Sequence, residues 1–330
     1  MSSEIVAETP GGRPIHELRL ENDTLTARLL TYGATLRDLR LAGIEHPLVL
    51  GFEDAADYTR EMPYMGAIVG RVANRIARGT AEIGGSTCLF DLNERHVQTL
   101  HGGHDGSGRR LWKIEEASGT HAVLSDTMPD GHMGFPGTLK VKVRYSLEGP
   151  ALVIAITATT DAPTLCNFAP HSYFNLSGSD VIDDHLLSVA ADLWQPVDRR
   201  QIPEGPPVPV EGTSYDLRQP AQVPHGIDHG FCLSDTRRAP RHVATLTAGG
   251  TRMNIETTEP GLQVYDGSLI SVPDGLGLGG RSYGARAGIA LETQAWVDAA
   301  NIGARAQVDL FPGESYRHFS RFVFARQPQT

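Results

Sequence analysis

Hydrophobic and polar residues alternate along much of the chain, as they do in β-strands that have one buried and one solvated face. The segment LKVKVRYSLE (139–148) has an apolar or aromatic side chain at every second position, with Lys, Arg, Ser or Glu between them. After a Gly-Pro pair, ALVIAITATT (151–160) follows the same period. The two segments are therefore predicted to form a β-hairpin.

Similar segments occur near both ends of the chain, and only one stretch favours a helix. The strand-like segments are HELRLENDTLTARLLTYG (16–33), TAGGTRMNIETT (247–258), which begins with a Gly-Gly turn, and YRHFSRFVFAR (316–326). FEDAADYTREM (52–62) predicts one short helix.

Glycine and proline divide the chain into short pieces. The 36 glycines and 21 prolines argue against long helices. The Pro-rich IPEGPPVPVEG (202–212) is interpreted as a loop, and no internal repeat or long linker is present. Many short strands without alternating helices predict an all-β fold, a large antiparallel β-sandwich that forms one domain over residues 1–330.

Charge and targeting signals narrow the range of partners. The formal net charge is −10, from 29 Lys and Arg against 39 Asp and Glu. Such a surface repels phosphate backbones and anionic membranes, so we expect neither nucleic acid nor a membrane as partner. The first 20 residues lack the basic and apolar regions of a signal peptide. We therefore predict a cytoplasmic protein, and the oligomeric state stays open.

The cysteines and the glycine-rich motifs give no sign of a cofactor. Cys88, Cys166 and Cys232 are far apart and are expected to be free thiols that pack as small hydrophobes. GLGLGG (275–280) matches the dinucleotide fingerprint G-x-G-x-x-G, but no helix start follows it, so it is interpreted as a loop. No phosphate-binding P-loop is present.

Two further motifs allow either a structural or a functional interpretation. LHGGHDGSG (100–108) carries His101 and His104, which could begin a zinc site but lack a third ligand and a glutamate base. A surface turn with solvated histidines is favoured. In GRVANRIARG (70–79), Arg71, Arg75 and Arg78 have the spacing of one helical face, and a solvated basic stripe is favoured. The alternative is that one guanidinium turns inward and binds the hydroxyls of a polyol.

Three candidate acid–base groups lie in or beside apolar segments. GIALETQAW (288–296) is predicted to be a buried strand, yet it contains Glu292, which must be ion-paired, hydrogen-bonded or raised in pKa. Asp228 precedes an apolar run in HGIDHGFCL (225–233), where an Asx-turn is the default interpretation. His171 stands among aromatics in NFAPHSYFNLSG (167–178), either as a core histidine or as a group that moves a proton.

An ordered set of motifs resembles one family, the aldose 1-epimerases or galactose mutarotases. The motifs are GFEDAADYTREMPYMGAIVGRVANRIARG (51–79), LHGG (100–103), DGHMGFPGTLKVKVRY (130–145), HSYFNLSG (171–178), QPVDRRQIPEG (195–205), YDLRQP (215–220), IDHGFCL (227–233), PGLQVYDG (260–267), LETQ (291–294) and PGESYRH (312–318). The resemblance implies the family's large β-sandwich, with neither a cofactor nor a metal. It also implies interconversion of the α and β anomers of an aldose, such as the neutral aldohexoses glucose and galactose.

The resemblance also implies a role for individual residues. Glu292 would be the base that takes the proton of the C1 hydroxyl, and His171 the acid that protonates the ring oxygen, the two facing each other across the sugar. His101 would bind near the reacting end of the sugar. The remaining hydroxyls would be held by Arg75, Asn74, Asp228 and Gln263.

The chain departs from the usual family pattern at several positions near these motifs. They are Ala169 and Pro170 before His171, Ser107 after LHGG, Asp266 in QVYDGSLI and Val297 after LETQ. We expect such differences to change the sugar preference more than the reaction.

Three other functions stay open at this point. The same scaffold could serve a sugar-binding or regulatory protein without catalysis. It could also serve an epimerase for hexose 6-phosphates, which would need a basic cluster for phosphate. A glycoside hydrolase could use Glu292 together with Asp228.

Overall fold

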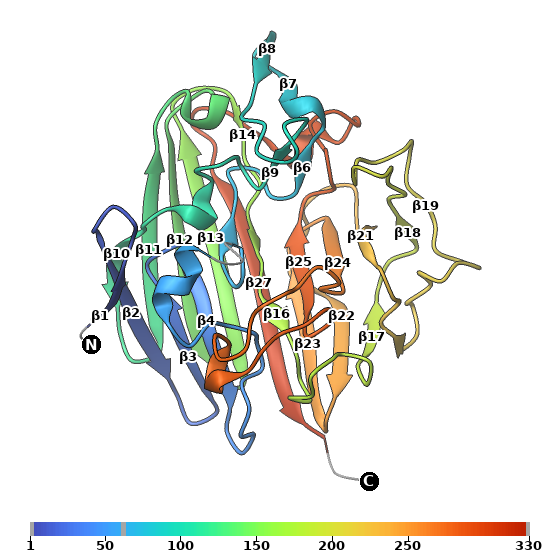
Figure 1. Ribbon diagram of the computed structural model, residues 1–330. Coiled ribbons are helices and arrows are strands. Elements are labelled where there is room, and N and C mark those ends of the chain that lie inside the picture. Colours follow the sequence, from blue (N-terminus) through green and yellow to red (C-terminus); the bar gives the residue numbers. More distant parts are fainter. Residues whose placement is uncertain (1–2, 61–63, 328–330) are drawn as a thin grey trace.

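The computed structural model describes residues 3–60 and 64–327, and its named strands all pair antiparallel (Figure 1). The largest sheet has nine strands. In spatial order these are β10 (Lys113–Ala117), β11 (His121–Met128), β12 (Leu139–Glu148), β13 (Ala151–Thr160), β27 (Tyr316–Arg326), β23 (Thr251–Thr257), β22 (Arg241–Ala248), β17 (Leu186–Val189) and β20 (Ala221–Gln222). The predicted all-β fold class is confirmed.

Two smaller sheets and four strand pairs complete the framework. The six-stranded sheet has the order β16 (Tyr173–Phe174), β25 (Ile289–Gln294), β24 (Gly261–Tyr265), β21 (Asp228–Cys232), β18 (Leu193–Trp194) and β19 (Val208–Pro209). The four-stranded sheet comprises β1 (Glu4–Glu8), β2 (Pro14–Glu21), β3 (Leu25–Leu30) and β4 (Thr35–Leu41). The pairs are β5 (Ile68–Val69) with β15 (Ala169–Pro170), β6 (Arg75–Ile76) with β9 (Thr99–Leu100), β7 (Thr80–Ile83) with β8 (Ser86–Leu89), and β14 (Thr164–Leu165) with β26 (Asp309–Leu310).

Turn chemistry explains the two best-defined hairpins. Glu148 pairs with Ala151, so Gly149 and Pro150 alone connect β12 to β13. Gly149 has φ +57°, which suits the first position of a type II′ turn, and proline fixes a negative φ at the second. Gly249 and Gly250 both have positive φ between β22 and β23, as a type I′ turn requires. The first hairpin confirms the prediction from periodicity, and the second confirms the predicted Gly-Gly turn that enters a strand.

The core lies between the nine-stranded sheet and the two smaller sheets. One cluster of buried residues joins leucines of β2 to Leu124 and Val141 of the large sheet. The same cluster contains Phe174 of β16 and Phe322 of β27, whose ring centroids are 5.4 Å apart. Figure 1 shows β25, β24 and β21 lying over β27, β23 and β22. The six-stranded sheet therefore has an inner face on the core and an outer face directed away from it.

Helical structure is confined to short 3-10 turns in the described part of the chain. They are η1 (Ala55–Thr59), η2 (Ala77–Gly79), η3 (Ser107–Arg109), η4 (His132–Gly134), η5 (Leu278–Gly280) and η6 (Arg305–Gln307). The predicted short helix is η1, capped by the Asp54 carboxylate, and the end of that prediction, residues 61–62, lies outside the described residues. None of these helices has the length and apolar character needed to traverse a bilayer.

The cysteines and the glycine-rich loop agree with their predicted roles. All three thiols are free, with Cys166 and Cys232 buried and Cys88 half-buried. Residues 275–280 lie in the connection between β24 and β25, where η5 is a single turn rather than the long helix that a dinucleotide site needs.

Candidate active site

The candidate site lies on the outer face of the six-stranded sheet, where strand register brings polar side chains together. Gln263 of β24 is directly paired with Glu292 of β25, so the two side chains project from the same face. Leu291 and Thr293, the neighbours of Glu292, point to the inner face because successive side chains alternate. All six residues of β25 are buried, so both faces of this strand are covered, as its apolar sequence predicts.

Glu292 is a buried carboxyl that has no Lys or Arg as an ion-pair partner among residues 3–60 and 64–327. Its side chain is 3% exposed, and Oε2 makes no hydrogen bond within the described residues. The pKa of Glu292 is raised to about 8, chiefly by burial and also by the nearby Asp228, while Arg75 opposes the shift. A carboxyl of this kind is able to exchange a proton near neutral pH.

The backbone around His171 is fixed on both sides. The β15 residues Ala169 and Pro170 pair with β5, the His171 N–H donates to Ala67 O at 2.9 Å, and the His171 carbonyl accepts from Gly66 N at 2.9 Å. Burial lowers the pKa of His171 to about 4. The imidazole is therefore neutral, and hydrogen bonds of its own backbone fix its position.

Glu292 and His171 meet directly. His171 Nε2 lies 3.6 Å from Glu292 Oε1, a distance too short for a sugar ring to lie between them. The expected arrangement across a sugar is therefore corrected to a side-by-side one. Such a pair suits two oxygens that are bonded to the same carbon, because each group can reach one of them from the same side.

His101 adds a third nitrogen to this pair. Its side chain is buried, and its ring lies 5.2 Å from that of His171, edge to face. Gly102 allows the loop to pack closely, because a Cβ at this position would lie 2.2 Å from Gly70 O. The favoured interpretation of a solvated histidine is therefore wrong for His101. It is right for His104, which is exposed and bonded to Asp91.

A hydrogen bond fixes the tautomer of His101. The Asn74 N–H donates to His101 Nδ1 at 3.1 Å, and the His101 N–H donates back to Asn74 O at 3.0 Å. Nδ1 is therefore an acceptor, and the neutral ring carries its proton on Nε2. Asn74 and His101 also have positive φ, +62° and +50°, a strained backbone that clusters at functional sites.

The site also contains side chains of the kind that bind metal ions. Ligand atoms of His101, His171 and Glu292 lie within 4.8 Å of one another, so the trio is the metal candidate among the described residues. A metal on His101 Nε2 would require the proton to move to Nδ1, where it would oppose the Asn74 N–H. The tautomer suits donation to a substrate oxygen better than metal ligation.

Arg75 is anchored by a carboxylate that no sequence pattern singled out. Its Nε and Nη2 donate to the two oxygens of Glu94 at 2.9 and 3.0 Å, and Gln98 also contacts Glu94. The charge of Arg75 opposes the raised pKa of Glu292 and lowers the pKa of His171. The residues before η2 form short extended pieces instead of a helix.

The predicted basic stripe is therefore wrong. Arg71 is buried and donates to backbone carbonyls, including Pro136 O at 2.9 Å, whereas Arg78 lies in η2 with φ +56°. Each of the three arginines has a different environment, and the inward-facing alternative describes Arg75.

Asp228 and Gln263 form a hydrogen-bonded pair beside the site. Gln263 Nε2 donates to Asp228 Oδ1 at 2.6 Å, and Gln263 Oε1 is buried with no partner in the described part of the chain. Burial raises the pKa of Asp228, against the effects of Arg75 and Gln263. The Asx-turn interpretation is wrong, because Asp228 begins β21 and its carboxylate faces the neighbouring strand.

Aromatic rings enclose the pair and were not singled out from the sequence. Tyr64 lies 4.6 Å from the His101 ring, and Tyr173 lies 5.1 Å from the His171 ring. Tyr173 is paired with Ala290 of β25, so its side chain shares the face of Glu292. Tyr173 could have been identified from the sequence by its place two residues after His171 in the HSYFNL segment.

The positions that depart from the family pattern have mainly structural contacts. Ser107 is buried and donates to Ile68 O at 2.6 Å. Asp266 is buried in an ion pair with Arg286 at 2.7 Å. Val297 is close to the outer face, since its Cγ2 would lie 3.6 Å from a Cβ at Gly230.

Comparison with known proteins agrees with the geometry. A family model described as aldose 1-epimerase matches residues 16–323. A galactose mutarotase of Rattus norvegicus is 38% identical over 339 residues, with 97% of each chain covered. An aldose 1-epimerase of Escherichia coli K12 is 32% identical, covering 98% of this chain and 99% of its own.

Solved structures show the same likeness. An aldose epimerase homologue from C. elegans superposes with a TM-score of 0.88 at 29% identity, over 94% of this chain and 99% of its own. A galactose 1-epimerase from Lactobacillus acidophilus superposes with a TM-score of 0.85 at 27% identity, over 99% of both chains. The chain thus belongs to the aldose 1-epimerase family, whose members are isomerases that interconvert the anomers of an aldose.

Proposed function

We propose that Glu292 and His171 are the base and the acid with which this chain interconverts the α and β anomers of a neutral aldohexose such as glucose or galactose. The observation that carries the proposal is the 3.6 Å contact between two buried groups of opposite acid–base character. In ring opening, Glu292 takes the proton of the C1 hydroxyl while His171 gives one to the ring oxygen, and the bond from C1 to that oxygen breaks. Rotation about C1–C2 and the reverse proton movements close the ring on the other face.

The proton count of the pair is the same throughout this cycle. One proton enters and one leaves in each half-reaction, so Glu292 and His171 together hold a single proton before and after. Burial favours the neutral distribution in the free protein, with the proton on Glu292. The same distribution is reached after ring opening. The form that begins ring opening has Glu292 ionised and His171 protonated, and one proton transfer across the 3.6 Å contact produces it.

The remaining site residues are proposed to bind the sugar. Arg75 has its Nε and Nη2 occupied by Glu94, which fixes the orientation of the guanidinium. The His101 Nε2–H would stabilise negative charge on a sugar oxygen. Gln263 and Asp228 together offer an acceptor and a carboxylate to neighbouring hydroxyls. Asn74 positions His101 through its backbone.

Polarimetry on freshly dissolved α-glucose and α-galactose tests the proposal. Acceleration of the optical change over buffer is expected, and tight binding without acceleration would instead support a sugar-binding protein. Competition by glucose and glucose 6-phosphate separates the neutral sugar from the phosphate ester. We expect glucose to compete better, because the guanidinium of Arg75 is already engaged by Glu94.

A further inference from the structure

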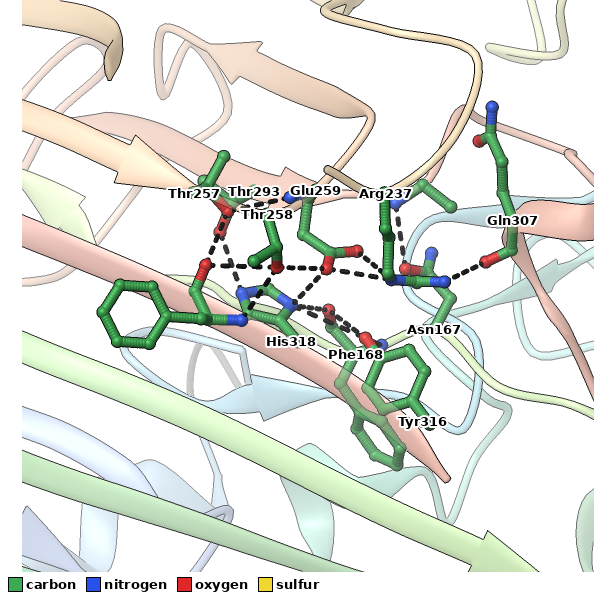
Figure 2. A network of polar contacts seen from close by, with 12 residues as sticks. Asn167, Phe168, Arg237, Thr257, Thr258, Glu259, Thr293, Gln307, Tyr316 and His318 are labelled. Atoms are coloured by element: carbon green, nitrogen blue, oxygen red, sulfur yellow. Dashed lines mark hydrogen bonds and ion pairs between the residues drawn. The ribbon is translucent and has the colours of Figure 1, made fainter. Parts of the chain in front are cut away.

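The inner face of β25 carries a buried polar network that the proposed reaction does not use (Figure 2). Thr293 follows Glu292, and its side chain points away from the site toward β27. Thr293 Oγ1 lies 3.2 Å from His318 Nε2 and 2.7 Å from Ser320 Oγ. All three side chains are buried, His318 completely.

The other nitrogen of His318 reaches the segment that carries His171. His318 Nδ1 lies 3.1 Å from Phe168 O, three residues before His171. The Phe168 N–H donates to Tyr316 Oη at 3.0 Å, so both backbone groups of Phe168 are held by side chains of β27. One imidazole ring therefore contacts the neighbours of both members of the proposed catalytic pair.

The network assigns the protons of this ring. Phe168 O can only accept, so the His318 Nδ1–H donates to it. The Ser320 hydroxyl then donates to His318 Nε2 at 2.8 Å, and the Thr293 hydroxyl donates to Ser320 Oγ at 2.7 Å. Every buried group in the chain from Phe168 to Thr293 has a partner in this arrangement.

The charges around His318 are compatible with a neutral ring. Burial lowers the pKa of His318, although the carboxylate of Glu259, 3.8 Å from Nδ1, acts in the opposite direction. Glu259 is already paired with Arg237, whose Nε lies 3.0 and 3.1 Å from its two oxygens. Arg237 in turn lies over the Tyr316 ring, 4.6 Å from its centroid.

We propose that His318 is a positioning residue that sets the spacing between Glu292 and His171 by bridging the backbone of Phe168 and the side chains of Thr293 and Ser320. The inference rests on the proposed function for its consequence in catalysis. Proton transfer needs donor and acceptor atoms within hydrogen-bond reach, so small shifts of either segment reduce turnover. Asn167 makes a second connection, since its Oδ1 accepts from Ala295 N at 3.0 Å, and it limits the size of the shift.

Two substitutions separate bridging from mere filling of space. His318→Leu removes both polar contacts, whereas His318→Asn places an amide N–H where Nδ1 stands and retains donation to Phe168 O. Tyr58→Phe is the control, because it removes a different buried hydrogen bond, from Phe52 N at 3.0 Å, that lies outside this network. We expect His318→Leu to lower kcat at least about tenfold with KM within about threefold, and His318→Asn to recover part of kcat. The control should lower Tm with kcat unchanged.

Crystal structures of the variants supply a readout that does not depend on turnover. The distance from His171 Nε2 to Glu292 Oε1 should increase in His318→Leu and return toward the original value in His318→Asn. If His318→Leu does not fold, His318→Gln takes its place, because it keeps a polar group near Nε2 but loses the donor to Phe168 O. An unchanged distance, or equal effects of His318→Asn and His318→Leu on kcat, overturns the proposal. If this distance changes as expected but the original protein has no mutarotase activity, the proposed function is overturned, whereas the bridging role of His318 is not.

Discussion

Replacing Glu292 by Gln should make the protein more stable above neutral pH while it removes catalysis. Glutamine has the shape of a protonated glutamate but cannot ionise. In the folded protein the pKa of Glu292 is about 8, against an ordinary value of 4.5. Because the folded pKa is raised, the stability of the protonated form is fully present below pH 4.5 and is lost as the pH rises to 8.

The size of this effect follows from the two pKa values. At about 1.36 kcal/mol per pH unit, the difference between 8 and 4.5 corresponds to about 5 kcal/mol. Most of it, about 4 kcal/mol, accumulates between pH 5 and pH 9. Glu292→Gln should therefore gain this amount in free energy of unfolding, relative to the original protein, over the same interval. Loss of the base should lower kcat by about 10²- to 10⁴-fold.

Urea denaturation at pH 5, 7 and 9 measures the stability difference, and polarimetry at pH 7 measures turnover. Glu45→Gln is the matched control, because Glu45 is exposed and should leave the pH dependence of the stability unchanged. A stability difference between Glu292→Gln and the original protein that is constant from pH 5 to pH 9 would refute the argument from burial. Retained turnover would refute the assignment of the base.

Three other substitutions and one pH profile test the remaining roles. His171→Asn should reduce kcat about 10²-fold or more while sugar affinity by calorimetry stays within about tenfold. Glu94→Gln should lower kcat/KM about tenfold, because it breaks the paired hydrogen bonds that orient Arg75, and an unchanged value in polarimetry would contradict this. Gly230→Ala should raise KM about tenfold in polarimetry, since Gly230 is paired with Gln263 and the new Cβ, on the same face, would lie 2.9 Å from Oε1 of the buried Gln195. The profile of kcat/KM should fall below pH 4 and above pH 8, where the catalytic pair no longer holds one proton; a flat profile through pH 9 would disagree.

The strands were predictable because their signals are local. Alternation within residues 139–160, together with Gly149 and Pro150, determines which side chains face the core and where the chain turns. The buried carboxyl of Glu292 could also be expected, because an acidic residue inside an apolar strand must have a perturbed environment.

Several features of the site depend on distant contacts and leave no local pattern. His101 is buried because the loop after β9 packs on Gly70, and nothing in LHGGHDGSG distinguishes it from exposed His104. The helical spacing of the arginines in residues 70–79 is coincidental, because this segment is held by the pairing of β6 with β9 and by a β-bridge between Val72 and Asn167. Glu94 has no motif, and its pairing with Arg75 spans 19 positions of the chain.

The pairing of β24 with β25 also restricts how this protein can change length over evolutionary time. One inserted or deleted residue within either strand would exchange its two faces, turning Glu292 toward the hydrophobic interior and Thr293 outward. The same change in the connection between these strands, residues 266–288, leaves the pairing intact. We therefore expect related chains to vary in length in that connection and to keep the spacing inside β24 and β25 constant.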